Sequence, residues 1–258
     1  MGILNVTPDS FSDGALRMEP GQAVSHALSM VEAGADIIDL GGESTRPGSV
    51  GVSEDEELRR VMPVVERLMP LLNIPLSLDT TKSGVAARAL AAGVEIINDI
   101  SGLVFDGEMA GVVSDFNAGL VLMHTRGRPA TMQHDTFYGA LVTEVCSGLA
   151  SSLKQALRAG ITAEQIVLDP GIGFGKERAG NLELLRRLHE LLGLGRPLLI
   201  GSSRKGLTAT AAGRTVGSRL FTTAATIALA VANGARVLRV HDVAAMRDVA
   251  DMAWEIAG

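Results

Sequence analysis

The sequence predicts an α/β protein with a single domain over residues 1–258, folded as a (β/α)8 TIM barrel. Eight short apolar runs alternate with eight helical patterns along the 258 residues, and each run ends at a polar residue. Alternating strands and helices form a parallel sheet, and eight such units in about 250 residues match a closed barrel. An open, doubly wound sheet is the alternative. No linker, repeat array or low-complexity segment indicates a second domain.

The segment IVLDPGIGFGK, residues 166–176, shows the repeating unit most clearly. Its apolar, β-branched start is stopped by an acidic residue, a proline and three glycines, which is typical of a strand buried on both faces. Asp169 therefore stands where the chain leaves the sheet. A buried charge is costly without a partner, so this carboxylate either caps the next element or binds a ligand.

Seven other apolar runs end in the same way. In chain order, the expected strands are Gly2–Leu4, Asp36–Leu40, Ile74–Leu78, Glu95–Ile97, Gly119–Met123, Ile166–Leu168, Pro197–Ile200 and Arg236–Val240. The polar residues at their ends are Asn5, Asp39, Asp79, Asn98, His124, Asp169, Ser202 and His241. The carboxyl ends of all barrel strands lie on one face. We therefore expect these eight side chains to surround one pocket.

The helices follow from amphipathic periodicity and from their end signals. Gln22–Ala33 carries apolar residues on one face and is ended by Gly34. Glu54–Leu72 begins after Ser53, with Glu56 three residues further on, which is a capping pattern. The other expected helices are Lys82–Ala92, Glu108–Asp115, Leu141–Ala159, Asn181–Leu192, Thr222–Asn233 and a last helix that ends at Ile256.

Composition and charge exclude several classes of protein. The net charge of −6 argues against nonspecific nucleic-acid binding. Cys146 is the only cysteine, so no internal disulfide forms, and we expect it to pack a helix. The N-terminus has no signal-peptide pattern, and the longest apolar tract, Ala224–Ala232, is too short to span a membrane. We expect a soluble cytoplasmic protein that binds neither nucleic acid nor membrane.

Single motifs are weak signals here. GIGFGK is not a phosphate-binding P-loop, because Pro170 takes the place of its first glycine and Glu177 follows the lysine. Taken alone it indicates a tight turn between a strand and a helix. Asp79, Asp169 and His241 could instead be helix caps. Arg46 and Lys205 could instead be solvated loop residues. Neither a zinc-binding His-x-x-Glu-His motif nor a cysteine cluster is present.

The signal comes from the combination. The central strands supply carboxylates and an amide, while cations follow the second, seventh and eighth strands. Moreover, MGILNVTPDSFSDG, GGESTRPG, SLDT, IINDISG, LMH-x-x-G-x-P-x-x-MQ, LDPGIGFGK, GSSRK and RVHDV, in this order from residue 1 to 243, closely resemble the dihydropteroate synthase family of folate biosynthesis. The resemblance implies a (β/α)8 barrel and a homodimer formed through the late helices.

The activity implied by the resemblance is a transfer reaction. Enzymes of this family condense 6-hydroxymethyl-7,8-dihydropterin diphosphate with 4-aminobenzoate, giving 7,8-dihydropteroate and diphosphate. Diphosphate leaves first and a cationic methylene remains. The aniline nitrogen is unprotonated at neutral pH, so no strong general base is expected.

Carried over residue by residue, the family pattern predicts three subsites and a metal. The pterin subsite comprises Asp79, Asn98, Ile100, Met123, Asp169, Phe174, Lys205 and Arg239, with Ile3 on the same apolar wall. The diphosphate subsite comprises Asn5, Thr45, Arg46, Arg239 and His241. The aminobenzoate subsite comprises Thr45, Pro47, Phe174, Ser203 and Lys205. The expected catalytic residues are Lys205, Asp79, Asp169 and Arg239.

Each subsite has a chemical reason. The pterin edge needs fixed carboxylates and amides, and Arg239 can stack on the ring face. Mg²⁺ would bridge the diphosphate and Asn5, which stabilises the leaving group. Arg204 belongs to the family's SRK motif without a defined role.

Two other functions stay open. A pterin-dependent corrinoid methyltransferase has a similar barrel but no diphosphate site, so the TPDSFSDG and STRPG loops argue against it. A non-catalytic pterin-binding paralogue is disfavoured because the expected ligand residues are intact. The loop around Phe174 lacks the insertion found in sulfonamide-resistant forms of the family, so we expect a sulfonamide-sensitive enzyme. The segment 206–223 departs from the family pattern and bears on aminobenzoate and sulfonamide affinity.

Overall fold

The computed structural model describes residues 1–7, 19–208 and 219–258. Within them, eight strands form one parallel sheet whose spatial order is the order of the sequence. The strands are β1 Gly2–Asn5, β2 Ile38–Gly41, β3 Leu76–Asp79, β4 Ile96–Asp99, β5 Gly119–Met123, β6 Ile166–Asp169, β7 Leu198–Ile200 and β8 Ala235–Leu238. Most of the TPDSFSDG loop and residues 209–218 of the atypical segment lie outside the described residues.

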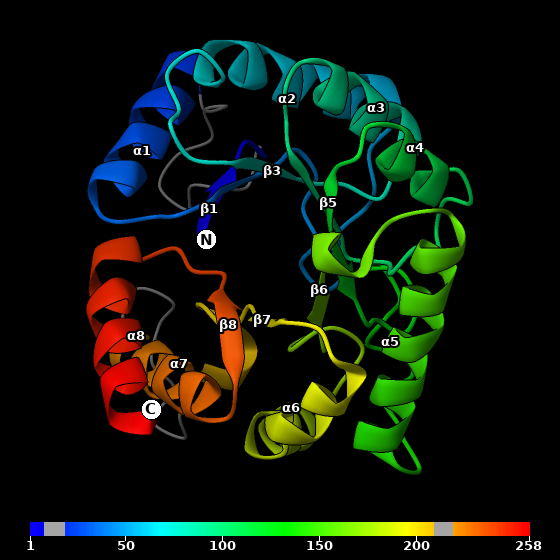
Figure 1. Cartoon of the computed structure of the whole chain (residues 1–258), viewed down its shortest axis with the longest axis vertical. Helices are drawn as coiled ribbons and strands as arrows, with labels where there is room; N and C mark the ends of the chain where they lie inside the picture. The colour runs from blue at the N-terminus through cyan, green and yellow to red at the C-terminus, as the bar shows by residue number, and fades with distance from the viewer. Residues whose placement is uncertain (8–18, 209–218) are drawn as a thin grey trace.

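Helices connect the strands and cover the outside of the curled sheet (Figure 1). They are α1 Pro20–Glu32, α2 Glu54–Leu68, α3 Ser83–Ala91, α4 Met109–Asp115, α5 Leu141–Arg158, α6 Arg178–Arg186, α7 Leu220–Ala232 and α8 Val243–Ala257. Short 3₁₀ turns lie at Ala163–Gln165, Leu188–Leu194 and Gly206–Thr208. The predicted alternation of eight strands and eight helices is confirmed.

The two ends of the sheet meet beyond β8. Val240 forms a parallel bridge with Gly2. The backbone N–H of Ile3 donates to the Val240 carbonyl at 2.9 Å, and the Val240 N–H donates to the Met1 carbonyl at 3.0 Å. The last segment of the sheet therefore lies beside the first.

Several predicted boundaries were wrong, each for a local reason. The helix predicted to reach Leu72 ends at Leu68, because Pro70 has no N–H with which to continue it. The predicted helix Asn181–Leu192 is split into α6 and a 3₁₀ turn. Apolar residues continue across the break, so the sequence pattern alone did not reveal it. Ser53 does cap α2, since its hydroxyl accepts from the Glu56 N–H at 3.2 Å.

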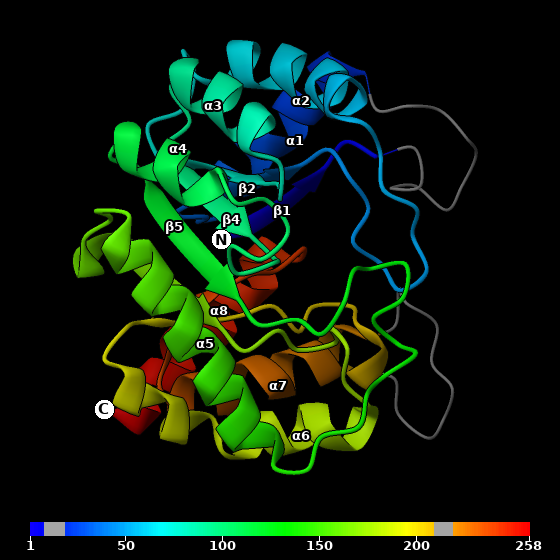
Figure 2. The ribbon, with the colours of Figure 1, turned by 90° about the vertical axis from the view of Figure 1, so that its right-hand side faces the viewer.

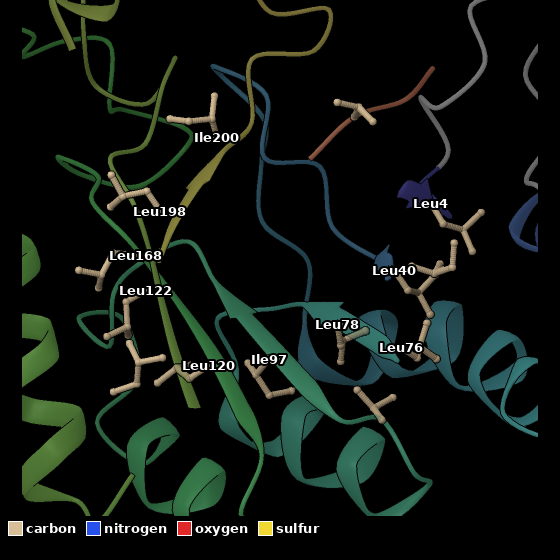
Figure 3. Packing of buried hydrophobic residues seen from close by; sticks show 14 of the residues in the cluster. Leu4, Leu40, Leu76, Leu78, Ile97, Leu120, Leu122, Leu168, Leu198 and Ile200 are labelled. Atoms are coloured by element: carbon tan, nitrogen blue, oxygen red, sulfur yellow. The ribbon is translucent and has the colours of Figure 1, made fainter. Parts of the chain in front are cut away.

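Alternation along each strand separates the core from the site. Leucine and isoleucine side chains on the outer face of the sheet pack against the helices (Figure 3). In β3, for example, Leu76 and Leu78 are part of this core, and Ser77 and Asp79 point to the opposite face. The buried polar side chains are thus gathered inside the sheet. No helix in the described part of the chain is both long and apolar enough to cross a membrane.

Candidate active site

The candidate site lies at the carboxyl ends of the strands. The loops that follow β2 and β5 lie on the same side of the molecule (Figure 2). They touch where the Gly48 N–H donates to the Pro129 carbonyl at 3.0 Å. Thr45 of the first loop lines a cavity of about 90 Å³ together with Asp79 and Ile100. Residues from three strand ends thus border one space.

Arg239 is the centre of a buried ionic network. Its Nε donates to Asp39 Oδ2 at 2.6 Å, and its Nη2 donates to Asp79 Oδ2 at 2.8 Å. Asp39 is fully buried and also accepts from Ser77 Oγ at 2.6 Å and Asn98 Nδ2 at 3.1 Å. The two aspartates therefore hold the guanidinium in a fixed orientation.

Asp39 was missed as a site residue, although it was recognised as a polar strand-end residue. The signal was present, since it is a charged residue inside the apolar run IIDLGG and needs a buried partner. That partner is 200 residues away in the sequence.

The four residues predicted to be catalytic influence one another electrostatically. Burial raises the pKa of Asp79 to about 7, although the Arg239 guanidinium opposes this shift. Burial also raises the pKa of Asp169, against the opposing effect of Lys205. Burial lowers the pKa of Lys205 to about 8, and Asp169 opposes that shift. Desolvated charged groups that act on one another in this way are typical of ligand sites.

The apolar wall is formed by a small cluster separate from the main core. It contains Ile100, Met123, Met132 and Phe174. Three of these were predicted; Met132, from the MQ pair of the β5 loop, was not. Lys205 Nζ lies 4.4 Å from the centroid of the Phe174 ring. Ile3 is buried on β1 in register with Asp39 and lies outside this cluster.

His241, one of the residues predicted to bind the anion, lies just before α8. The Ser203 hydroxyl lies 3.1 Å from His241 Nδ1 and accepts from the His241 N–H at 3.2 Å. Burial, followed by the charges of Arg204 and Arg239, lowers the pKa of His241 to about 4. The positive charge of Arg46, on the exposed loop after β2, also lowers the pKa of His241. Arg46 is therefore near enough to His241 to act on it electrostatically. The imidazole is neutral at pH 7.

Asn5 lies beside Asp79 over a glycine. A Cβ at Gly41 would lie 3.1 Å from Asn5 Oδ1 and 4.0 Å from Asp79 Oδ2. The missing side chain therefore leaves open the space between an amide oxygen and a carboxylate. Arg204, in contrast, is bound to Asp242 at 2.6 Å and 3.2 Å. It ties the β7 loop to the start of α8.

Two strand-end residues do not face the pocket, so that expectation was wrong for them. The His124 ring packs against α5, where a Cβ at Gly148 would lie 2.7 Å from it. The Ser202 hydroxyl lies 2.8 Å from the Thr226 hydroxyl of α7. Side chains alternate along the backbone. Met123 and Ser203 take the inner positions, and their neighbours face the helices.

The two neutral histidines predict acid sensitivity. Burial lowers the pKa of His124 from 6.5 to about 3, and His241 is lowered to about 4. The unfolded chain binds more protons below pH 6.5, so the free energy of unfolding should fall as the pH drops from about 6.5 towards 4. Urea unfolding of His124→Gln should show a weaker dependence on pH in this range. The exposed His26→Gln is the control, and equal slopes in wild type and His124→Gln would contradict the assignment.

Comparisons with known proteins agree with this geometry. A family model described as pterin binding enzyme matches residues 1–241. A dihydropteroate synthase of Synechocystis is 47% identical over 262 residues, covering 98% of this chain and 89% of that protein. A Clostridium difficile dihydropteroate synthase, crystallised with pteroic acid, superposes with a TM-score of 0.92 at 45% identity and covers 99% of this chain and 95% of that one. A Yersinia pestis dihydropteroate synthase in complex with a sulfonamide drug gives 0.94 at 41%, covering 99% and 92%.

Proposed function

Because the chain belongs to the pterin-binding enzymes, among the dihydropteroate synthases, we propose that it condenses 6-hydroxymethyl-7,8-dihydropterin diphosphate with 4-aminobenzoate. The products are 7,8-dihydropteroate and diphosphate. The observation that carries this proposal is that Asp79, Asp169, Lys205 and Arg239 lie close enough together to act on one another's charge, with Arg239 bound to Asp79 at 2.8 Å and beside Lys205 at Gly201. The bridge between Val240 and Gly2 supports a closed (β/α)8 TIM barrel formed by one domain.

The pterin ring would bind across the carboxylates. Asp79 and Asp169 would accept hydrogen bonds from ring N–H groups. Asn98 donates its amide N–H to Asp39, which leaves its carbonyl oxygen as an acceptor for the ligand. The cluster of Ile100, Met123, Met132 and Phe174 would cover the apolar ring faces. A buried site with few fixed polar groups is the usual form of a small-molecule pocket.

The diphosphate would lie against Asn5, Thr45, Arg46, Arg239 and His241. The described residues contain no group of three or more His, Cys, Asp or Glu side chains suited to hold a metal. Asn5 offers one amide oxygen beside Asp79, over the open space at Gly41. This suits Mg²⁺ held mainly by diphosphate oxygens, as is common for this ion. When bound, Mg²⁺ would neutralise charge on the leaving group.

The side chains of this chain would then guide a dissociative reaction. The C–O bond to diphosphate breaks, and the cations Arg46 and Arg239 stabilise the departing charge. The aniline nitrogen next forms a bond with the methylene carbon and loses a proton. Thr45, Pro47, Phe174, Ser203 and Lys205 would orient the aminobenzoate. Because His241 is neutral, it would donate or accept a hydrogen bond rather than supply a charge.

Diphosphate release is the direct test. We expect release from the pterin diphosphate to depend on 4-aminobenzoate, with dihydropteroate formed in equal amount. Binding of the pterin without any turnover would indicate a non-catalytic paralogue. Methyl transfer to a corrinoid without diphosphate release would indicate that the protein is a pterin-dependent methyltransferase.

The charge on the β2 loop gives a second test. Arg46→Ala should weaken binding of the pterin diphosphate about tenfold or more and leave binding of unphosphorylated hydroxymethylpterin nearly unchanged. The reason is that Arg46 is expected to contact only the anion. Isothermal titration calorimetry with both ligands measures the ratio. Equal losses for the two ligands would show that Arg46 does not bind the diphosphate.

Sulfonamides should inhibit the enzyme in competition with 4-aminobenzoate. The sulfonyl group is bulkier than a carboxylate, so rejection needs a steric element, and the sequence shows none between Gly173 and Lys176. A steady-state assay with sulfamethoxazole against varied 4-aminobenzoate measures the competition. Normal turnover without inhibition, at drug concentrations well above the KM for 4-aminobenzoate, would contradict this prediction and point to the segment 206–223.

We also propose a homodimer formed through α7 and α8. These adjacent helices carry exposed large apolar side chains, namely Leu220, Phe221, Leu229, Met252, Trp254 and Ile256. Apolar surface of this kind often marks an interface. Sedimentation should show a dimer that Leu229→Glu dissociates. The matched control is Leu71→Glu, which changes an exposed leucine just after α2, outside these two helices.

A further inference from the structure

The loop after β6 is held almost entirely by side chains. Each carbonyl from Gly171 to Glu177 accepts a hydrogen bond from a side chain. The donors in order are Lys176, Lys205, Gln133, Lys176, Tyr138, Asn181 and Asn181. Gly171, Gly173 and Gly175 have positive φ angles of 71°, 84° and 55°. Glycine adopts this conformation without a steric penalty, so the sequence allows a path that the side chains then fix.

Lys176 is the central donor of this loop. Its ammonium donates to the carbonyls of His124, Gly171 and Phe174 at 3.2, 3.0 and 2.9 Å. An ammonium has three N–H donors, so each has an acceptor. Lys176 is only 3% exposed. Its N–H donors are therefore used inside the protein and do not face the anion that GIGFGK superficially suggests.

The ammonium joins two neighbouring strands. His124 follows β5, and Gly171 and Phe174 follow β6. The approach is close, since a Cβ at Gly171 would lie 1.9 Å from the His124 carbonyl oxygen and 3.2 Å from Lys176 Nζ. Glycine is required at this position for the contact to form.

Two predicted ligand groups depend on this arrangement. The Phe174 carbonyl is bound by Lys176, and the Phe174 ring lies against Lys205 Nζ. Lys205 Nζ also donates to the Ile172 carbonyl at 2.6 Å. Loss of the Lys176 ammonium would leave the His124 and Phe174 carbonyls without this donor, while the Gly171 carbonyl would keep only the Phe174 N–H at 3.1 Å, which favours a different loop path. The positions of Phe174 and Lys205 would then change together.

We propose that Lys176 is a positioning residue for the aminobenzoate half of the site, acting through Phe174 and Lys205. This inference rests on the proposed function. Most of the hydrogen-bonding edge of the pterin subsite is held differently. Asp39 from β2 accepts from Asn98 and Arg239, and Arg239 in turn donates to Asp79. Only Asp169 of that edge is bonded to the β6 loop, through the Gly171 N–H at 2.7 Å. Disturbing the β6 loop should therefore affect the aminobenzoate end more than the pterin end.

The test is Lys176→Met, which keeps an unbranched chain of similar length but has no donor. Lys154→Met, at an exposed position of α5, is the control. Calorimetry should show pteroic acid binding about tenfold weaker or more, with a clearly smaller loss for hydroxymethylpterin, because only part of its subsite is linked to the β6 loop. In turnover, the KM for 4-aminobenzoate should rise more than kcat falls. Losses confined to thermal stability, or equal losses for both ligands, would overturn the proposal.

A chemical rescue separates position from packing. Cys146 is the only cysteine, so Lys176→Cys in a Cys146→Ala background has a single thiol. Alkylation with 2-bromoethylamine in denaturant, followed by refolding, forms a thioether and restores an ammonium at the lysine position. We expect recovery of the pteroic acid affinity, and no recovery would overturn the proposal. These binding ratios do not need turnover, so a wild type that releases no diphosphate would contradict the proposed function without deciding this point.

Discussion

Arg239→Ala is expected to lower the free energy of unfolding by about 3–5 kcal/mol and to abolish condensation, because it breaks a buried ionic network. Arg239 is 15% exposed and binds Asp39 and Asp79, which are 0% and 7% exposed. Without the guanidinium, Asp39 keeps only the hydroxyl of Ser77 and the amide of Asn98 as donors. Urea unfolding at pH 7 measures the loss.

The matched control is Arg247→Ala. Arg247 also binds two aspartates, Asp36 and Asp251, but all three side chains are exposed. Exposed ion pairs contribute about 0–1 kcal/mol, so this variant should remain close to wild type in stability and activity. Equal small losses in both variants would show that the Arg239 network is not important for stability. Full turnover by Arg239→Ala would show that the residue does not act in the reaction.

Asp79→Asn and Asp169→Asn should each remove tight pterin binding. Each substitution replaces an acceptor oxygen by an N–H₂ donor that faces a ring N–H, and an unsatisfied buried donor costs about 1–3 kcal/mol, or more when a charge is involved. Affinity for hydroxymethylpterin should fall about tenfold to a hundredfold or more. Calorimetry measures this loss, and unchanged affinity in both variants would contradict the role of these carboxylates.

Asp79 adds a dependence on pH to that result. Burial raises its pKa to about 7, so the fraction ionised increases as the pH rises through 7. Since the ionised form is the acceptor, pterin affinity should increase over the same range. The amide of Asp79→Asn does not titrate, so the variant should lose this component of the pH dependence. The control is Glu95→Gln, which lies just before β4, at the end of the strand opposite to the site.

The order of strands and helices could be predicted from the sequence because it depends on local pattern. In β3, the run LSLD contains the alternation that buries Leu76 and Leu78 and directs Asp79 inward. Turns were equally readable, since Gly34 and Gly93 follow α1 and α3 with positive φ angles. Local conformational preference and the hydrophobic period were sufficient for these features. The helix end at Leu68 was missed because the apolar period continued past Pro70.

The site residues were predicted from two sources, the family pattern and the positions of the strand ends. The sequence located the strand ends to within one or two residues. That precision does not determine which face a residue at the strand end takes, since a shift of one residue reverses it. His124 and Ser202 were placed wrongly for this reason. Asp39 was missed because its partner lies on β8, at the other end of the chain.

By itself, the sequence determined eight strand–helix units, polar residues at the strand ends and glycines in the β6 loop. Only the tertiary structure decided the partners of the buried charges: Arg239 lies between Asp39 and Asp79, and Lys176 binds three carbonyls. The physical reason is that strand and turn formation depend on neighbours in the chain. The pairing of buried charges instead depends on which side chains the folded structure brings together away from water. Those side chains are distant in the sequence.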